Sequence, residues 1–297
     1  MSARRRIAAV TAVIAAAATS FAIYSPPADA AAPINDEYVA LGDSFVAGPL
    51  ILPQEQLDPC FRSSVDYPHV IAQALHAKVF RDVACSSATT ANILTEPQKA
   101  DLPWDPAMPL QLDAVSAHTT LVTVTIGAND IGLAGLALTC FNLLPPPLGT
   151  SCEQTQTAGG VDRGAQLVDS AAPLIAETLD AIHHKAPHAR IVITSYADFI
   201  QPDGCYPIQP VWPRDANYIQ GLVNRLGALT ARVAPQHHAE YVDLITPGIG
   251  HDGCQLLQNW VNVLVPGTTL GIVPLHPTAL GEQNFARVIV AHLAGAH

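Results

Sequence analysis

Two apolar runs of this chain end in the same way, at a glycine that is followed by short polar residues. The first run, at 38–41, precedes Gly-Asp-Ser at 42–44, and the second, at 120–126, precedes Gly-Ala-Asn-Asp at 127–130. Short apolar runs bounded by turn residues are typical of central strands in a parallel sheet, which are buried on both faces. Open α/β sheets bind their ligands at the carboxyl ends of such strands. We therefore expect the polar residues of both turns to lie at one sheet edge.

The rest of the chain alternates helical and strand patterns. The spacing of apolar residues predicts helices at 66–76, 161–184, 217–233 and 279–292, and strands at 79–83, 190–194 and 239–244. This alternation predicts an α/β fold, a three-layer α/β/α sandwich with a central, mostly parallel five-stranded sheet. No Ser- or Gly-rich linker divides the chain, so we expect a single domain over residues 31–297.

The first 30 residues have the anatomy of a secretory signal peptide. Three arginines at 4–6 precede an apolar run at 7–18, and the small-x-small sequence Ala-Asp-Ala follows at 28–30. A retained membrane anchor is the alternative, but the apolar run is short for a membrane span and two prolines interrupt its far side. We expect cleavage after residue 30 or 32 and a secreted mature protein.

The charge of the chain limits the partners that it can bind, and its cysteines and histidines indicate disulfides and no metal site. A net charge of −11 with few basic runs argues against nucleic-acid binding and against electrostatic docking on anionic membranes, but it does not exclude a neutral lipid. Six cysteines in an exported chain favour three disulfides, for which sequence alone allows fifteen pairings. None lies in a C-x-x-C pair, and the adjacent histidines at 183–184 and 237–238 diverge on a helix surface, so we expect no metal site.

Ser44 is a candidate nucleophile only if other segments supply a base and an oxyanion site, because serine alone reacts poorly. His276 precedes the last predicted helix and therefore lies beside the same sheet edge, where its ring can reach a serine on another strand. Asn129 has a side-chain amide that can bind an oxyanion, and the small residues at 85–90 can aim main-chain N–H groups at a negative charge. For each motif alone, a helix cap or an Asx turn is the competing interpretation.

The three motifs together resemble the SGNH (GDSL-like) hydrolase family. They are Gly-Asp-Ser at 42–44, Gly-Ala-Asn-Asp at 127–130 and Leu-His-Pro at 275–277, in the family's order and across most of the mature chain. The stretch 84–90 and the cysteine spacing look more narrowly like the secreted actinobacterial esterases and lipases of that family. The resemblance implies a flavodoxin-like SGNH hydrolase fold and a reaction that needs no metal and no organic cofactor.

The resemblance also implies roles for single residues. Ser44 is then the nucleophile and His276 its base, and the oxyanion hole consists of the Ser44 amide, the Ser87 amide and the Asn129 side chain. The implied disulfides are Cys60 with Cys85, Cys140 with Cys152, and Cys205 with Cys254.

Two positions depart from the family's pattern. Ser87 stands where the family has glycine, so its main-chain N–H can serve only if the turn does not need a conformation that is reserved for glycine. Val273 stands where many members carry the aspartate that orients the histidine. We expect the backbone carbonyl of Val273 to take that role, with Asp243 or Asp252 as alternatives.

The sequence therefore predicts a secreted serine ester hydrolase, an esterase or lipase that cleaves carboxylic esters of lipids or other acyl esters. The alternatives are a carbohydrate or cell-wall acetyl esterase and a catalytically weak cell-wall binding protein on the same fold. The apolar, proline-bounded loop at 49–53 beside Ser44 either lines an acyl pocket or covers the core, and aliphatic loops of this kind favour acyl chains over sugars. We expect a small-molecule or lipid ester as substrate, no nucleic acid, no stable membrane insertion and a monomer.

Overall fold

A single parallel sheet organises the part of the chain that the structure describes. The computed structural model describes residues 34–55, 59–99 and 106–295, and the expected signal peptide at 1–30 lies outside these residues. The strands are β1 (Glu37–Gly42), β2 (Val79–Asp82), β3 (Leu121–Thr125), β4 (Arg190–Ala197) and β5 (Glu240–Leu244). They pair in the order β2-β1-β3-β4-β5, and every neighbouring pair is parallel. The predicted five-stranded α/β sheet with flavodoxin-like order is confirmed.

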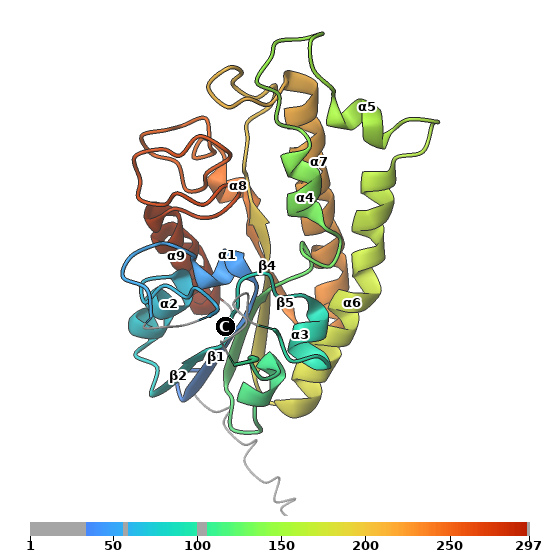
Figure 1. Cartoon of the computed structure of the whole chain (residues 1–297). Helices are drawn as coiled ribbons and strands as arrows, with labels where there is room; N and C mark the ends of the chain where they lie inside the picture. Colours follow the sequence, from blue (N-terminus) through green and yellow to red (C-terminus); the bar gives the residue numbers. More distant parts are fainter. Residues whose placement is uncertain (1–33, 56–58, 100–105, 296–297) are drawn as a thin grey trace, which may run out of the picture. The chain divides into compact units, whose positions relative to one another are not determined.

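Helices cover both faces of this sheet. On one face α2 packs against α9, and on the other α6 packs against α7 (Figure 1). The helices are α1 (Ser44–Ala47), α2 (Tyr67–Leu75), α3 (Thr90–Leu94), α4 (Leu133–Leu138), α5 (Cys152–Gln156), α6 (Arg163–Lys185), α7 (Pro213–Val233), α8 (Ile245–Gly248) and α9 (Ala279–Gly295), with short 3-10 turns at Gln111–Ala114 and Ala234–His237. The predicted three-layer sandwich is therefore confirmed.

The predicted helices match α2, α6 and α9, each of which begins within two residues of its expected start. Helix α7 instead begins one turn before the expected residue 217. Pro213 occupies its first turn, directly after Trp212. Proline suits that position, because its φ is already helical and its missing N–H has no partner to lose there.

The centre of the sheet is buried, and its polar groups are paired. Strands β1 and β3 are buried along their whole length, as their apolar runs predict. The Tyr67 and Thr194 hydroxyls both share hydrogen bonds with Thr125 Oγ1, at 2.8 and 2.6 Å. At the end of β1 the Gly42 amide donates to the Gln111 side chain at 2.8 Å, and Gln111 Nε2 donates back to the Gly42 carbonyl at 2.9 Å. These bonds fix the point at which the chain leaves the sheet.

Three disulfides join the loops, and their pairing is the one that the family resemblance implies: Cys60–Cys85, Cys140–Cys152 and Cys205–Cys254. Beside the first of them, the Cys85 amide donates to the Gly42 carbonyl at 3.0 Å, so this bridge is anchored to the end of β1. Among the described residues, no helix combines the length and the apolar character that a membrane crossing requires.

Candidate active site

Ser44 lies on a tight turn between β1 and α1. A Cβ at Gly42 would lie 2.6 Å from the Thr125 carbonyl oxygen of the neighbouring strand, so only glycine allows this exit from the sheet. Asp43 caps α1, because its Oδ1 accepts a hydrogen bond from the Phe45 amide at 2.9 Å. Asp43 thus braces the turn, and Ser44 occupies the first position of the helix.

Tyr196 ties the Ser44 turn to the loop after β3. Its hydroxyl donates to Asp43 Oδ2 and accepts a hydrogen bond from the Ala128 amide at 3.1 Å. Burial raises the pKa of Asp43 to about 7, although the bonds from Tyr196 and Phe45 act in the opposite direction. Sequence reasoning missed Tyr196, which lies in β4 with no motif around it. The available signal was a tyrosine inside a buried strand, since a buried phenol needs a hydrogen-bond partner.

The loop after β3 is joined to the small-residue turn at 85–90. Asn129 Nδ2 donates to the Ala88 carbonyl at 2.9 Å, and the amide retains a second N–H. Asp130 accepts hydrogen bonds from the Thr90 amide at 3.1 Å and from the Thr90 hydroxyl at 2.6 Å. Asp130 therefore holds this loop by bonding to a main-chain amide, and Asn129 is fixed beside the turn that contains Ser87.

Ser87 itself adopts the conformation in which glycine is normally found. Its φ is +68°, in the left-handed region, and its side chain is exposed. A side chain in this region costs about 1–2 kcal/mol relative to the right-handed conformation. The turn thus keeps a shape that suits the family's glycine, and its main-chain N–H is retained.

His276 is oriented by a backbone carbonyl, but not by the expected one. Its Nδ1 lies 2.7 Å from the carbonyl oxygen of Pro274, so the assignment of Val273 is wrong by one residue. Leu275, between Pro274 and His276, has a φ of +61°, and this left-handed residue turns the Pro274 carbonyl back towards the ring. A carbonyl can only accept, so Nδ1 carries the proton and Nε2 is left as a base.

The surroundings of His276 keep its ring neutral. Burial lowers its pKa from the ordinary value of 6.5, and the bond to Pro274 only partly opposes this. The two aspartates considered as substitutes are engaged elsewhere. Asp243 accepts from the Ile245 amide at 2.8 Å, and Asp252 accepts from the Cys254 amide at 2.9 Å.

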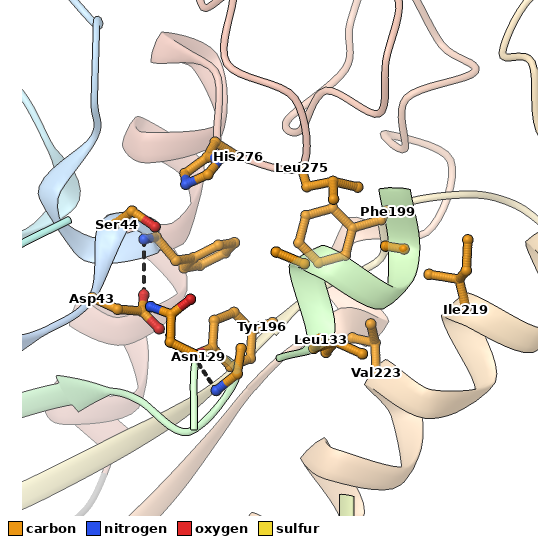
Figure 2. Close-up of a pocket in the computed structure, with 14 residues that line it drawn as sticks. Asp43, Ser44, Asn129, Leu133, Tyr196, Phe199, Ile219, Val223, Leu275 and His276 are labelled. Carbon is orange, nitrogen blue, oxygen red and sulfur yellow. Dashed lines mark hydrogen bonds between the residues drawn. The ribbon is translucent and has the colours of Figure 1, made fainter. Parts of the chain in front are cut away.

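One pocket brings Ser44, Asn129 and His276 together. Figure 2 shows their side chains on one side of it and those of Leu133, Ile219 and Val223 on the other. Further apolar lining comes from Ala134 and Ala137 of α4, from Phe199 after β4, and from Leu275 in the loop before α9.

The empty space between the residues that line this pocket is about 500 Å³, a figure that includes space open to solvent. Neither Ser87 nor the loop at 49–53 belongs to its lining, so the apolar wall comes from α4 and α7 and not from the proline-bounded loop.

One group of side chains has the composition of a metal site. Single ligand atoms of Asp66, His69 and Asp82 lie within 4.8 Å of one another. However, His69 Nδ1 lies 2.7 Å from Asp66 Oδ1, the length of a direct hydrogen bond, which leaves no room for a cation between these atoms. Burial raises the pKa of Asp66 to about 8 and that of Asp82 well above its ordinary value. Burial thus favours the uncharged form of both carboxyl groups.

Comparison with known proteins identifies the family to which this chain belongs. The model of the GDSL-like lipase/acylhydrolase family matches residues 40–283. The chain belongs to this family. Like other members of the GDSL-like lipase/acylhydrolase family, it is a carboxylic ester hydrolase.

Individual members of the GDSL-like family resemble the chain over most of its length. It is 34% identical to Lipase 2 of Streptomyces coelicolor over 290 residues, which cover 94% of this chain and 92% of the relative. The crystal structure of phospholipase A1 from Streptomyces albidoflavus NA297 matches with a TM-score of 0.69 at 25% identity and covers 86% of this chain and 99% of that one. The structure of an extracellular lipase from Streptomyces rimosus matches with the same TM-score at 26% identity and the same coverage. These likenesses place the chain in the actinobacterial branch of the family.

Proposed function

We propose that this protein is a secreted esterase or lipase that hydrolyses lipid esters through an acyl-enzyme on Ser44, with His276 as the base. The single observation that carries the proposal is the pocket in which Ser44, His276 and Asn129 face an apolar wall. A nucleophile, a neutral imidazole and an amide donor are the groups that acyl transfer needs. The apolar wall is suited to an acyl chain.

The reaction follows from these positions. Ser44 Oγ attacks the ester carbonyl carbon while its proton passes to His276 Nε2. The amides of Ser44 and Ser87 and the side chain of Asn129 donate hydrogen bonds to the oxyanion. The C–O bond to the alcohol then breaks, and the alcohol leaves with the proton from His276. Water attacks the acyl-enzyme with His276 again as base, which releases the carboxylic acid and restores Ser44.

The composition of the pocket supports lipid esters over acetylated sugars. A sugar site should offer several polar groups, whereas the wall opposite Ser44 is mainly aliphatic and includes Leu133, Ile219 and Val223. The names of the similar proteins, two lipases and a phospholipase A1, support the same substrate class.

Export is supported by three observations. Residues 1–30 have the pattern of a cleavable signal peptide. Three disulfides are characteristic of proteins from oxidising compartments. One similar structure is that of an extracellular lipase. We propose a secreted protein that functions as a monomer.

The test is the hydrolysis of p-nitrophenyl esters from acetyl to palmitoyl by the wild type and by Ser44→Ala, with circular dichroism on both. We expect turnover in the wild type, a preference for acyl chains longer than acetyl, and loss of turnover in a variant that stays folded. A folded, oxidised wild type that cleaves none of the esters would overturn the proposal, and a strict preference for acetyl would overturn its lipid part.

A further inference from the structure

Three loops lie at the carboxyl end of the sheet, and together they form what we call the rim: residues 139–151, 199–212 and 249–276. The first continues from α4, which lines the pocket through Ala137. The second begins with Phe199 and the third ends with His276, which both line the pocket directly. In Figure 1 all three run at the end of the molecule to which β1 and β3 point. The rim is therefore the surface that a substrate meets first.

The loops of the rim are fastened to one another. The disulfide Cys205–Cys254 joins the second loop to the third. Gln209 Nε2 donates to the Gly253 carbonyl at 2.7 Å across the same boundary. Between the first and second loops, Trp212 Nε1 donates to the Leu144 carbonyl at 2.9 Å. These links hold the three loops of the rim together.

The rim exposes large apolar side chains. Of the seventeen exposed large hydrophobic residues in the described part of the chain, nine lie in it: Leu143, Leu144, Leu148, Ile208, Ile249, Leu257, Val265, Leu270 and Ile272. Three of them are almost fully exposed, Leu143 at 82%, Leu257 at 80% and Leu270 at 75%. Isolated exposed apolar residues need no explanation, but an extended set around a pocket marks an interaction surface.

The rim also lacks charge, in a chain whose net charge is −11. The first loop contains no Asp, Glu, Lys or Arg, and the second and third contain one aspartate each, Asp203 and Asp252. Asp252 is fully buried, so Asp203 is the one formal charge that these loops expose. The absence of Lys and Arg removes the attraction that anionic lipids would need. Two copies of so acidic a chain repel each other, which disfavours self-association through this face.

We propose that the rim docks on an uncharged lipid–water interface, so that an ester passes from the lipid phase into the pocket without crossing water. This inference rests on the proposed function, because it names the physical form in which the substrate is presented. The occupant is a neutral or zwitterionic lipid surface. The exposed leucines enter it, and the acidic remainder of the surface stays in water.

The test measures binding separately from chemistry. Ser44→Ala protein is mixed with phosphatidylcholine vesicles and sedimented, with and without the added changes Leu143→Ser, Leu257→Ser and Leu270→Ser. None of these three leucines lines the pocket. The control carries Val65→Ser, Val161→Ser and Leu167→Ser, which are exposed apolar positions outside the rim. Circular dichroism verifies the fold of each variant.

We expect the rim variant to bind vesicles at least about tenfold more weakly and the control to bind within about twofold of the parent. Added salt should not weaken binding, because no ion pairs are involved. Equal binding by rim variant and control, or binding only to anionic vesicles, would overturn the proposal. A dimer that the rim changes abolish, without vesicle binding, would show instead that the rim joins two copies.

Failure of this proposal is distinguishable from failure of the proposed function. The wild type, which has Ser44, is tested on a soluble p-nitrophenyl ester, and this assay measures the chemistry without any lipid surface. Vesicle binding without ester turnover would leave the rim proposal standing and remove the esterase. Turnover of soluble esters without vesicle binding would leave the esterase proposal standing and remove the rim proposal.

Discussion

Ser44 and His276 reach the same pocket from different kinds of structure. Ser44 follows a buried strand, and its turn is held by Asp43, Tyr196 and Gln111 through hydrogen bonds on both sides. His276 lies on a long loop, and its ring is oriented by the Pro274 carbonyl. The proposed nucleophile is therefore fixed by the core of the protein, whereas the proposed base is fixed by the local conformation of its loop.

This difference has a chemical consequence. A carbonyl dipole fixes the tautomer of His276 but stabilises the imidazolium less than a buried carboxylate would. The His276 side of the site should therefore respond strongly to pH, and the Ser44 side should respond to mutations in the sheet. The following predictions test this contrast, from the largest expected effect to the smallest.

Replacement of His276 by alanine should give the largest effect. Without a base, Ser44 keeps its proton, and kcat for a soluble p-nitrophenyl ester should fall by about 10³-fold or more. The thermal unfolding midpoint should change little, because the ring is bonded only within its own loop. Steady-state kinetics and calorimetry check both statements, and a variant that retains substantial turnover would exclude His276 as the base.

Tyr196→Phe should lower kcat less than His276→Ala does, and it should act by displacing the main chain around the site. Tyr196 acts as a positioning residue, because its hydroxyl joins Asp43 to the Ala128 amide. Its removal leaves buried polar groups unpaired, which should cost about 1–3 kcal/mol in the free energy of unfolding. We expect kcat to fall about tenfold with little change in KM, since the oxyanion loop is displaced while the apolar wall is intact. A loss of stability with unchanged kcat would assign Tyr196 a structural role only.

The dependence of kcat/KM on pH should follow the protonation of His276. A protonated imidazole cannot accept the serine proton, so kcat/KM should rise with pH through the pKa of His276, which burial places below 6.5. Asp43, whose pKa is raised to about 7, is the competing group. In Asp43→Asn the acid limb should stay at the same pH if His276 causes it. Disappearance of the limb in that variant would assign it to Asp43.

Ser87→Gly should give the smallest effect. Glycine adopts the φ of +68° without strain, but it also loses more backbone entropy on folding. The net gain in the free energy of unfolding should be about 0.5 kcal/mol, with activity within about twofold of the wild type. Chemical denaturation measures the first quantity. A clear loss of stability would mean that the Ser87 side chain makes contacts that offset its strain.

Features that leave a local pattern in the sequence could be predicted, and features that depend on contacts between distant segments or on the conformation of a single loop residue could not. The turns after residues 38–41 and 120–126 were located correctly, because a buried strand and its terminal glycine leave a local pattern. The assignment of Val273 failed, because nothing in the sequence signals that Leu275 adopts a positive φ. Tyr196 and the α4 and α7 wall were missed because they reach the site only through packing of distant segments.

The most direct test of the central claim is to trap the nucleophile. A p-nitrophenyl alkylphosphonate reacts with an activated serine and leaves a stable phosphonyl group that mimics the tetrahedral intermediate. Intact-mass and peptide mass spectrometry of the treated wild type should show a single adduct on the peptide that contains Ser44, with complete loss of esterase activity and no adduct in Ser44→Ala. Full activity after treatment, or inactivation by an adduct on another residue, would contradict the assignment of Ser44 as the nucleophile.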